Sequence, residues 1–396
     1  MLIQRLASSL ALVASTYALL RFPCSQLVTE RFDPLVTPGE VSPHLHQIVG
    51  GNAFDLTMDP TIDIAETATC TTCRFKEDKS NYWTAVLYFK HPNGSFFRVP
   101  QMANHGTGPG TQSGGMTVYY FQPRAPTKNL NVTAFAPGFR MLVGNPMRRR
   151  DDIDPNSTAA KATTFRCFHG ADPGPFGSPG NGPDDTFELP NKICTGGIRT
   201  NIFFPQCWDG IHLDTPDHQS HVAHPSGPPA PDGLQFFGTD CPDTHPVRLP
   251  LLFIEIVWDT RPFNDPELWP KDGTQPFVFS MGDPTGYGQH ADYVFGWEGD
   301  SLQRAMDKCT DGNPAPEACP ELTPQDMETM NTCRLPVKVP EVTEDQYLDN
   351  LPGCNPIQEG PAYATPISNC DAVSTTVDAP LPTTPPPVIV PPWPMW

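Results

Sequence analysis

The chain has 396 residues, of which 50 are proline and 31 are glycine, and its formal net charge is −19 at pH 7. This composition disfavours long helices, because proline removes a backbone donor and glycine weakens helix interiors. The 38% of hydrophobic residues is enough for a packed core and argues against a disordered chain. The acidic balance argues against binding to nucleic acid or to an anionic membrane surface, since both depend on lysine and arginine.

The first 18 residues predict a secretory leader that is too short to span a bilayer comfortably. Arg5 precedes an apolar run over 6–13, and Thr16 and Ala18 fit the small-residue positions before a cleavage site. The 12 cysteines, an even number, are then expected to form disulfides in an oxidising, extracellular compartment. Acceptor sequences for N-linked glycans, which agree with secretion, begin at Asn93, Asn131 and Asn156.

Short stretches of aromatic and branched residues between proline, glycine and asparagine predict β-strands after the leader. The clearest stretches are 83–89, 116–121, 248–258 and 276–280. They favour a mainly β fold, a β-sandwich or jelly-roll-like single large domain over 19–310, with long loops, few helices and stapling disulfides. One helix is predicted over 300–309, with Leu302, Ala305 and Met306 on one face.

The composition of the sequence changes after the predicted helix. Cysteine and proline are spread through 311–370, which we interpret as a disulfide-stapled extension wrapped on the main domain or as a small module. The tail over 371–396 is rich in threonine and proline and is expected to be disordered or in polyproline II. Cys70 and Cys73 form a lone CxxC pair, which favours a structural role. The arginines at 148–150 are interpreted as a solvated turn or a processing-like site.

His44 and His46 are the first residues in the chain that point to metal chemistry. They are two residues apart, and on a strand this spacing places both side chains on one face, as a chelating pair requires. The competing interpretation is that each is an ordinary surface or core histidine. We therefore take them as candidate ligands of one divalent metal ion, whose identity the sequence leaves open.

The stretch WDGIHLDTPDHQSHVAHP, at 208–225, is the densest in titratable groups. Its three interpretations are a metal site, an acid/base site and a solvated loop or buried polar network, and the first two need groups that converge from several parts of the fold. We expect Asp217, His218 and His221 to act in catalysis. We expect Asp209 and Asp214 to bind substrate.

Partners for these groups occur in separate segments. His290 and Asp292 are again two residues apart and join the predicted catalytic set. The further residues expected to bind substrate are Trp83, Arg140, His245 and Asp283. Aromatic residues flank the same segments, and they could stack on sugar rings, although any one of them is more often core or rim packing. They are Tyr82, Trp83, Trp208, Tyr287, Tyr293 and Trp297.

Several catalytic signatures are missing from the sequence. It has no GxSxG elbow, no P-loop, no dinucleotide-binding fingerprint and no HExxH motif. The predicted mature chain does not begin with histidine, which argues against a histidine brace.

Seven motifs carry a family resemblance, and they occur in the order SPHLHQIVGGNAF, DKSNYW, APGFRML, FPQCWDG, LDTPDHQSHVA, CPDTHPVRLP and PFVFSMGDPTGYGQHADYVFGW. Together they resemble the fungal extracellular family catalogued as domain of unknown function nineteen-ninety-six, over about Leu27 to Cys309. Every candidate residue named above lies in these motifs. The resemblance implies a secreted fungal protein that acts in the cell wall or on surrounding polysaccharide. Some members of the family carry wall-binding WSC modules, whereas this chain has its own Cys/Pro-rich extension.

These observations lead to a functional hypothesis and an alternative. The hypothesis is a secreted protein that acts on cell-wall or other extracellular polysaccharide, as a hydrolase or lyase with a His/Asp cluster. Its cofactor is left open, with one divalent metal as the candidate. The alternative is a non-catalytic glycan- or metal-binding cell-wall protein, in which the His/Asp network only makes loops rigid. Neither expects nucleic acid or a membrane as a partner.

Overall fold

The computed structural model describes most of the chain, namely residues 19–102, 114–122, 131–155, 157–170, 179–180, 182–226, 240–313, 315–367 and 375–383. The predicted leader, Asn156 and the last part of the predicted tail lie outside the described residues. In the described part, no helix is both long enough and apolar enough to cross a membrane.

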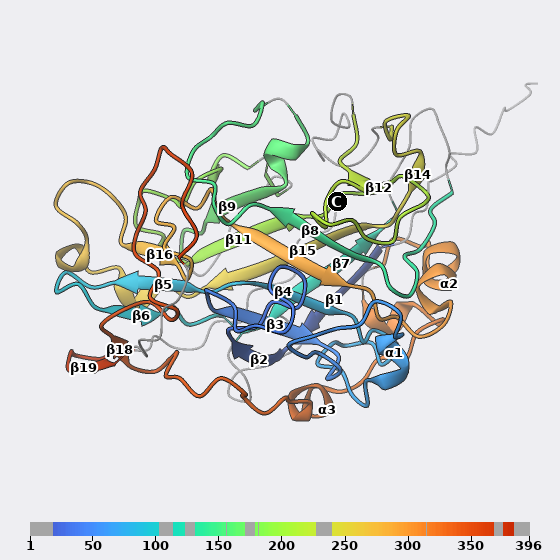
Figure 1. The fold of residues 1–396 in the computed structure, drawn as a ribbon, viewed down its shortest axis with the longest axis horizontal. Helices are drawn as coiled ribbons and strands as arrows, with labels where there is room; N and C mark the ends of the chain where they lie inside the picture. The colour runs from blue at the N-terminus through green and yellow to red at the C-terminus, as the bar shows by residue number, and fades with distance from the viewer. Residues whose placement is uncertain are drawn as a thin grey trace, which may run out of the picture.

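Two antiparallel sheets form the body of the molecule (Figure 1). The six-stranded sheet has the order β1 (Leu19–Cys24), β7 (Met116–Phe121), β15 (Leu251–Trp258), β11 (Ile198–Phe203), β9 (Thr163–Cys167) and β10 (Asp185–Thr186). The five-stranded sheet has the order β2 (Gln26–Glu30), β3 (His46–Gly50), β4 (Asn81–Ala85), β17 (His290–Val294) and β8 (Arg140–Gly144). The structure confirms the prediction of a mainly β, sandwich-like single large domain.

Smaller elements surround the two sheets. A second five-stranded sheet contains β16 (Phe277–Phe279), β5 (Leu87–Lys90), β6 (Phe96–Arg98), β18 (Tyr347–Leu348) and β19 (Thr376–Val377). A three-stranded sheet contains β13 (Val222–Ala223), β12 (Cys207–Trp208) and β14 (Val247–Arg248). The α-helices in the described residues are α1 (Ile64–Thr67), α2 (Ser301–Lys308) and α3 (Met327–Thr332). Helix α2 is the predicted one, and the stretch predicted as one strand over 83–89 is divided into β4 and β5.

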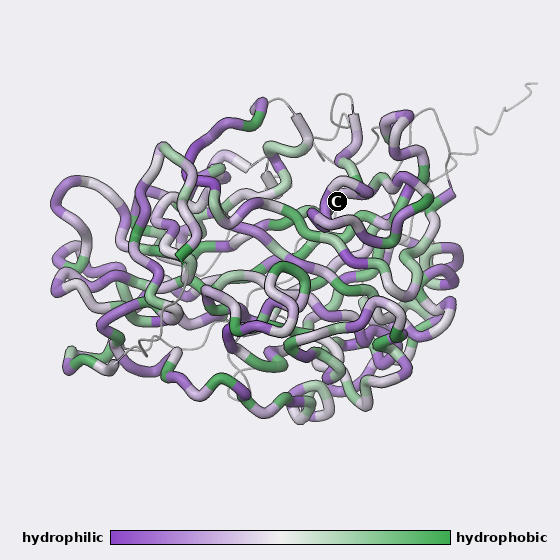
Figure 2. Tube along the Cα trace, in the orientation of Figure 1, coloured by the Kyte–Doolittle hydropathy of each residue, from purple (hydrophilic) through white to green (hydrophobic). Residues whose placement is uncertain are grey.

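The sandwich core lies between the inner faces of the two large sheets. Figure 2 shows hydrophobic stretches along the central strands. This core also holds a polar network, in which the Tyr120 hydroxyl lies 2.7 Å from that of Tyr82 and 3.0 Å from that of Tyr293. The Tyr82 hydroxyl also donates to the carboxyl of Asp78 at 2.8 Å. Burial raises the pKa of Asp78 to about 7.

The outer face of the five-stranded sheet is covered by the chain between β2 and β4. Apolar side chains from this covering segment, such as Phe32 and Phe54, pack on Ile48, Trp83 and Val294 of the sheet. Side chains alternate between the two faces of a strand. The outer face therefore also receives the side chains at every second position along β3 and β17, which is where the candidate site forms.

Disulfides tie distant parts of the described chain together. They join Cys24 to Cys73, Cys70 to Cys333, Cys167 to Cys194, Cys207 to Cys241 and Cys309 to Cys319. Cys354 is also disulfide-bonded, and none of the described cysteines is free. The two cysteines of the CxxC pair thus belong to different disulfides, so the pair is structural.

The predicted extension packs along the main domain in its described part. Cys333 is bonded to Cys70, and Arg31 pairs with Glu341 at 2.7 Å. Farther along, β18 pairs with β6 of the main domain. These contacts place the described part of the extension against the covering segment and against β6 of the second five-stranded sheet.

Candidate metal centre

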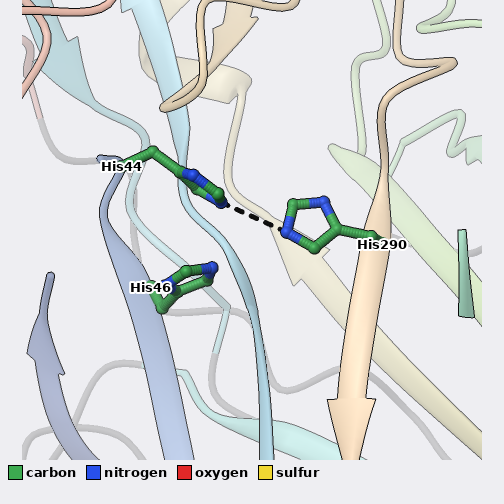
Figure 3. Close-up of side chains that lie close together, drawn as sticks. All are labelled: His44, His46 and His290. Carbon is green, nitrogen blue, oxygen red and sulfur yellow. Dashed lines mark hydrogen bonds between the residues drawn. The ribbon is translucent and has the colours of Figure 1, made fainter. Parts of the chain in front are cut away.

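His44, His46 and His290 lie together in one buried cluster (Figure 3). One ring nitrogen of each lies within 4.8 Å of the others, and the two Nε2 atoms of His44 and His290 are 3.2 Å apart. The ring centroid of His46 is 4.2 Å from that of His44 and 5.8 Å from that of His290. All three histidines are buried. Three converging imidazoles form a donor set that suits zinc, copper and other transition metals.

The strand register explains why residues so far apart in the sequence meet. His46 begins β3 and His290 begins β17, and both strands pair with β4. His46 pairs with Ala85, and continuing the β4–β17 register places Ala85 beside His290 as well. The small methyl group of Ala85 leaves room for the two rings to approach above it. On the other side, His290 pairs with Gly144, where a Cβ would lie 2.8 Å from the His290 Cα.

The loop before β17 fixes the orientation of His290. Its Nδ1 lies 2.9 Å from the carbonyl oxygen of Gly288 and donates to it, because a carbonyl can only accept. In the neutral ring, Nε2 is then the unprotonated nitrogen, and it faces the other two histidines. The amide of Gly288 in turn donates to Asp283 at 2.7 Å. Metal-binding histidines in proteins are held in this way by outer hydrogen bonds.

Asp283 forms a buried ion pair with Arg149, at 3.5 Å between Oδ1 and Nε. The guanidinium of Arg149 also donates to the carbonyl oxygens of Pro146 and Gln358 at 2.7 and 2.9 Å. Burial raises the pKa of the Asp283 carboxyl, and the charge of Arg149 is the largest influence in the opposite direction. A Cβ at Gly288 would lie 2.7 Å from a guanidinium nitrogen of Arg149, so the pair requires glycine there.

The buried Arg149 differs from the sequence interpretation of 148–150 as a solvated turn. Arg148 and Arg150 pair with nearby aspartates at the surface, whereas Arg149 is buried beneath them. No local pattern in a run of identical residues marks the middle one as buried. The sequence analysis therefore missed Arg149.

Burial keeps the three histidines in the form that binds metal. Desolvation lowers the pKa of His290 to about 4 and the pKa values of His44 and His46 well below the ordinary value. Neighbouring histidines lower those of His44 and His46 further, and Arg149 adds to the effect on His44 and His290. The imidazoles are therefore neutral near pH 7, and only a neutral imidazole offers a lone pair to a metal ion.

Unpaired polar atoms beside the cluster test whether a metal fits there. Both ring nitrogens of His46 and both carboxyl oxygens of Asp292 are buried without a hydrogen-bond partner. The backbone of Phe32 lies close enough to His46 to oppose the fall in its pKa, but outside hydrogen-bond geometry. A buried polar atom without a partner costs about 1–3 kcal/mol. An ion held by the three imidazoles would pair one of the two His46 nitrogens, so the histidines fit a metal centre.

Asp292 lies one row from the histidines on the outer face, because it is two residues after His290 on β17. Burial, and then the charge of Asp33, raises the pKa of Asp292 well above its ordinary value. Trp83 pairs with Asp292 across the strands. The indole nitrogen of Trp83 is close to Asp33 but outside hydrogen-bond geometry. The structure thus brings together the predicted residues His44, His46 and His290. Trp83 and Asp292 pair with each other on the same face of the sheet, and Asp283 supports the loop that orients His290.

The stretch at 208–225 covers the edge of β8 and contributes no residue to the histidine cluster. The amides of Arg140 and Leu142 donate to the carbonyl oxygens of Leu213 and His218, at 3.1 and 2.9 Å. The His221 ring donates to the carbonyl oxygen of Arg140 at 2.9 Å. Edge strands need such covering, because their unpaired backbone groups otherwise attract other strands. His218 and His221 therefore hold this loop on the sheet.

The aspartates of the same stretch are engaged in local turns. Asp217 accepts from the amide and the hydroxyl of Ser220, at 3.0 and 2.9 Å, and these and neighbouring bonds lower its pKa. Asp209 accepts from His212, and Asp214 bonds His218 at 2.6 Å. This arrangement fits the loop-and-network interpretation of the stretch, and the predicted roles of Asp209, Asp214, Asp217, His218 and His221 stay predictions.

The remaining predicted substrate-binding residues also lie apart from the cluster. The guanidinium of Arg140 is buried and donates twice to the carbonyl oxygen of Met58, at 3.1 Å each. His245 lies 3.1 Å from the carbonyl oxygen of Ser220. Among the aromatic residues, Tyr82, Trp83, Tyr293 and Trp297 are buried, whereas Trp208 and Tyr287 are half-buried. The buried aromatic rings offer no face for sugar stacking.

The His218–Asp214 pair predicts a pH-dependent stability. The hydrogen bond to Asp214 raises the pKa of His218, so the charged form of His218 stabilises the folded state. This stabilisation is fully present below the unfolded pKa of about 6.5 and is lost as the pH rises through the folded pKa. We expect His218→Gln to lower the free energy of unfolding by about 0.5–1 kcal/mol at pH 5.5 and by less at pH 9. Urea denaturation at both pH values measures this, with His245→Gln as control, because His245 contacts a hydroxyl and a backbone carbonyl and no carboxylate. An equal loss at both would refute it.

Comparison with known proteins places this site in a family. A family model described as a domain of unknown function (DUF1996) matches residues 33–297. No curated protein and no solved structure matches the chain. The matched span contains the three histidines, Arg149, Asp283 and Asp292. Because it covers more than half of the chain, this protein belongs to the DUF1996 family.

Proposed function

We propose that this chain is an extracellular metal-binding protein of a polysaccharide matrix, in which His44, His46 and His290 hold one divalent transition-metal ion. The observation that carries the proposal is the convergence of three neutral imidazoles, with the Nε2 of His290 left unprotonated by the Gly288 carbonyl. Nitrogen donors of this kind suit Zn²⁺ or Cu²⁺. Three protein ligands leave at least one coordination position for another group.

The extracellular setting is supported by the predicted leader and by the disulfides. A fully oxidised set of described cysteines is typical of secreted proteins. The polysaccharide partner and the fungal cell wall rest on the family resemblance. The burial of all three histidines favours a metal that is held permanently over one that is exchanged with each turnover.

A second candidate, metal-dependent hydrolysis of the polysaccharide, is favoured by Asp292. Its unpaired carboxyl lies on the face of the cluster, one row from His290. A bound divalent ion would supply an acidified water molecule to such a reaction. Asp292 would accept a hydrogen bond from that water and orient it, as carboxyl groups in outer shells do.

The test uses protein secreted from a eukaryotic host and dialysed against metal-free buffer. Inductively coupled plasma mass spectrometry should find close to one transition-metal ion for each chain. The protein is then incubated with fungal-wall and plant polysaccharides, with and without chelator, and products are read by mass spectrometry. A bound ion without product supports the metal-binding protein, and product that the chelator abolishes supports the hydrolase. A folded protein that binds no metal after exposure to Zn²⁺ or Cu²⁺ would refute both candidates.

A further inference from the structure

A groove of about 300 Å³ lies at the edge of the sandwich, where the ends of β8 and β9 approach each other. Buried apolar side chains such as Val143 and Ala162 form its floor. Its rim contains Arg148, Asp152, Gln219, Tyr287 and Tyr363, which are half-buried or exposed. We call this the rim-tyrosine groove. The stretch at 208–225 contributes Gln219 to its rim, and none of the three clustered histidines lines it.

The side chains of the rim are linked to one another, so the rim-tyrosine groove is preorganised. The guanidinium of Arg148 donates to Asp152 at 2.8 Å, and the Tyr363 hydroxyl donates to the same carboxylate at 2.8 Å. The Arg148 guanidinium also lies over the ring of Tyr287, 5.5 Å from its centroid. Gln219 is held by its bond to the carbonyl oxygen of Gly144 at 3.2 Å. A ligand would therefore find two tyrosine rings that already have fixed neighbours, which lowers the entropy cost of binding.

The groove adjoins the metal centre through neighbouring residues. Its wall residue Gly144 pairs with His290 across β8 and β17. Arg148 immediately precedes Arg149 of the buried ion pair, and Tyr287 immediately precedes Gly288, whose carbonyl orients His290. A ligand in the groove would thus contact residues adjacent in sequence or register to those that hold the centre.

The lining of the groove defines the chemistry of its ligand. Apolar floor residues and tyrosine rings suit a ligand with an apolar face, and the polar rim suits a ligand with hydroxyl groups at its edges. The charges of Arg148 and Arg150 are matched by those of Asp151 and Asp152, with which they pair, so the groove does not select for a charged ligand. Its volume is at the lower end of the range of about 300–1,000 Å³ for ligand pockets. A sugar ring has an apolar face, hydroxyl groups at its edges and no charge, so it matches this lining.

We propose that the rim-tyrosine groove binds a short, neutral oligosaccharide, an inference that deepens the proposed function by naming the glycan class and its binding site. The experiment measures binding by isothermal titration calorimetry and ligand-observed NMR. The probes are short β-glucan, chitin and xylan oligosaccharides, with a uronic-acid oligosaccharide as the charged comparison. Metal-free and metal-loaded protein are both measured.

Variants of Tyr363 locate the binding, because this side chain is 44% exposed and its removal should not affect folding. We expect Tyr363→Ala to weaken binding of the neutral oligosaccharide by about threefold to tenfold, the range that an aromatic contact contributes. Tyr363→Phe keeps the ring and should weaken binding by less. Ile211→Ala, at an exposed position outside the groove lining, should leave binding unchanged.

Three results would overturn the groove proposal. They are no binding of any neutral oligosaccharide, binding that Tyr363→Ala leaves unchanged, and preferential binding of the charged comparison. Binding to the metal-free protein distinguishes this proposal from the metal centre. If metal stoichiometry is zero and the oligosaccharide still binds through Tyr363, the metal proposal fails alone.

Discussion

Replacement of His290 by alanine is expected to weaken the binding of Zn²⁺ or Cu²⁺ by more than about 100-fold, beyond the loss caused by removing an outer partner of a ligand. The variant removes one of three donors, and it is the donor whose ring is oriented by the Gly288 carbonyl. Affinity is measured by competition with a chelator of known strength. A second readout is thermal unfolding, because an ion at 100 times its dissociation constant stabilises the folded protein by about 2.7 kcal/mol.

Two further variants make the His290→Ala experiment decisive. His46→Ala should cause a loss of similar size, since it removes another donor of the same cluster. His245→Ala is the matched control, because His245 is a half-exposed histidine that bonds the carbonyl oxygen of Ser220 away from the cluster. Equal affinities for the wild type and His290→Ala, or a comparable loss in His245→Ala, would place the metal elsewhere.

The second large effect is expected at Asp283. Asp283→Ala leaves the buried guanidinium of Arg149 without its counter-ion, and breaking a buried pair in this way costs about 3–5 kcal/mol. It also frees the Gly288 amide, so the carbonyl that orients His290 loses its support. We therefore expect metal affinity to fall by about 10–100-fold in addition. Denaturant unfolding and chelator competition measure the two effects separately.

Asp272→Ala is the matched control for Asp283→Ala. Asp272 accepts from the amide and hydroxyl of Thr274, as Asp283 does from Thr285, but Asp272 is exposed and has no arginine partner. Its removal should have a much smaller effect on stability and none on metal affinity. If the two variants are equally stable, the buried pair with Arg149 contributes nothing.

The fold class could be predicted because its signals are local. Strand β7 covers the same residues as the apolar stretch 116–121, and α2 falls inside the predicted 300–309. The division of 83–89 into β4 and β5 could not be predicted, since the stretch holds no proline or glycine that would mark a break. It depends on the chain passing from one sheet to another, which is a property of the tertiary structure.

The candidate site was predictable in its parts but not in its assembly. The spacing of two residues marked His44 with His46, and separately His290 with Asp292. That His44 and His290 meet depends on strand register and on the small Ala85 between β3 and β17, across a separation of 246 residues. No pattern within either segment reports this contact.

The titratable groups at 208–225 also have local structural partners, which the sequence did not reveal. A loop that covers an edge strand must present donors and acceptors to its backbone, and polar side chains such as His221 supply them. Its aspartates are turn residues that accept bonds from nearby amides, as at Asp217. Composition alone does not separate such a loop from a catalytic one, since both are rich in histidine and aspartate.

X-ray absorption spectroscopy of the loaded protein tests the three-histidine centre most directly. The protein is secreted from a eukaryotic host, loaded with one equivalent of Zn²⁺ and freed of excess metal. The account predicts about three imidazole nitrogens at about 2.0–2.1 Å, with the multiple-scattering signature of histidine rings. In His290→Ala this histidine signature should decrease or disappear. A first shell of oxygen alone, or a spectrum that His290→Ala leaves unchanged, would contradict the account.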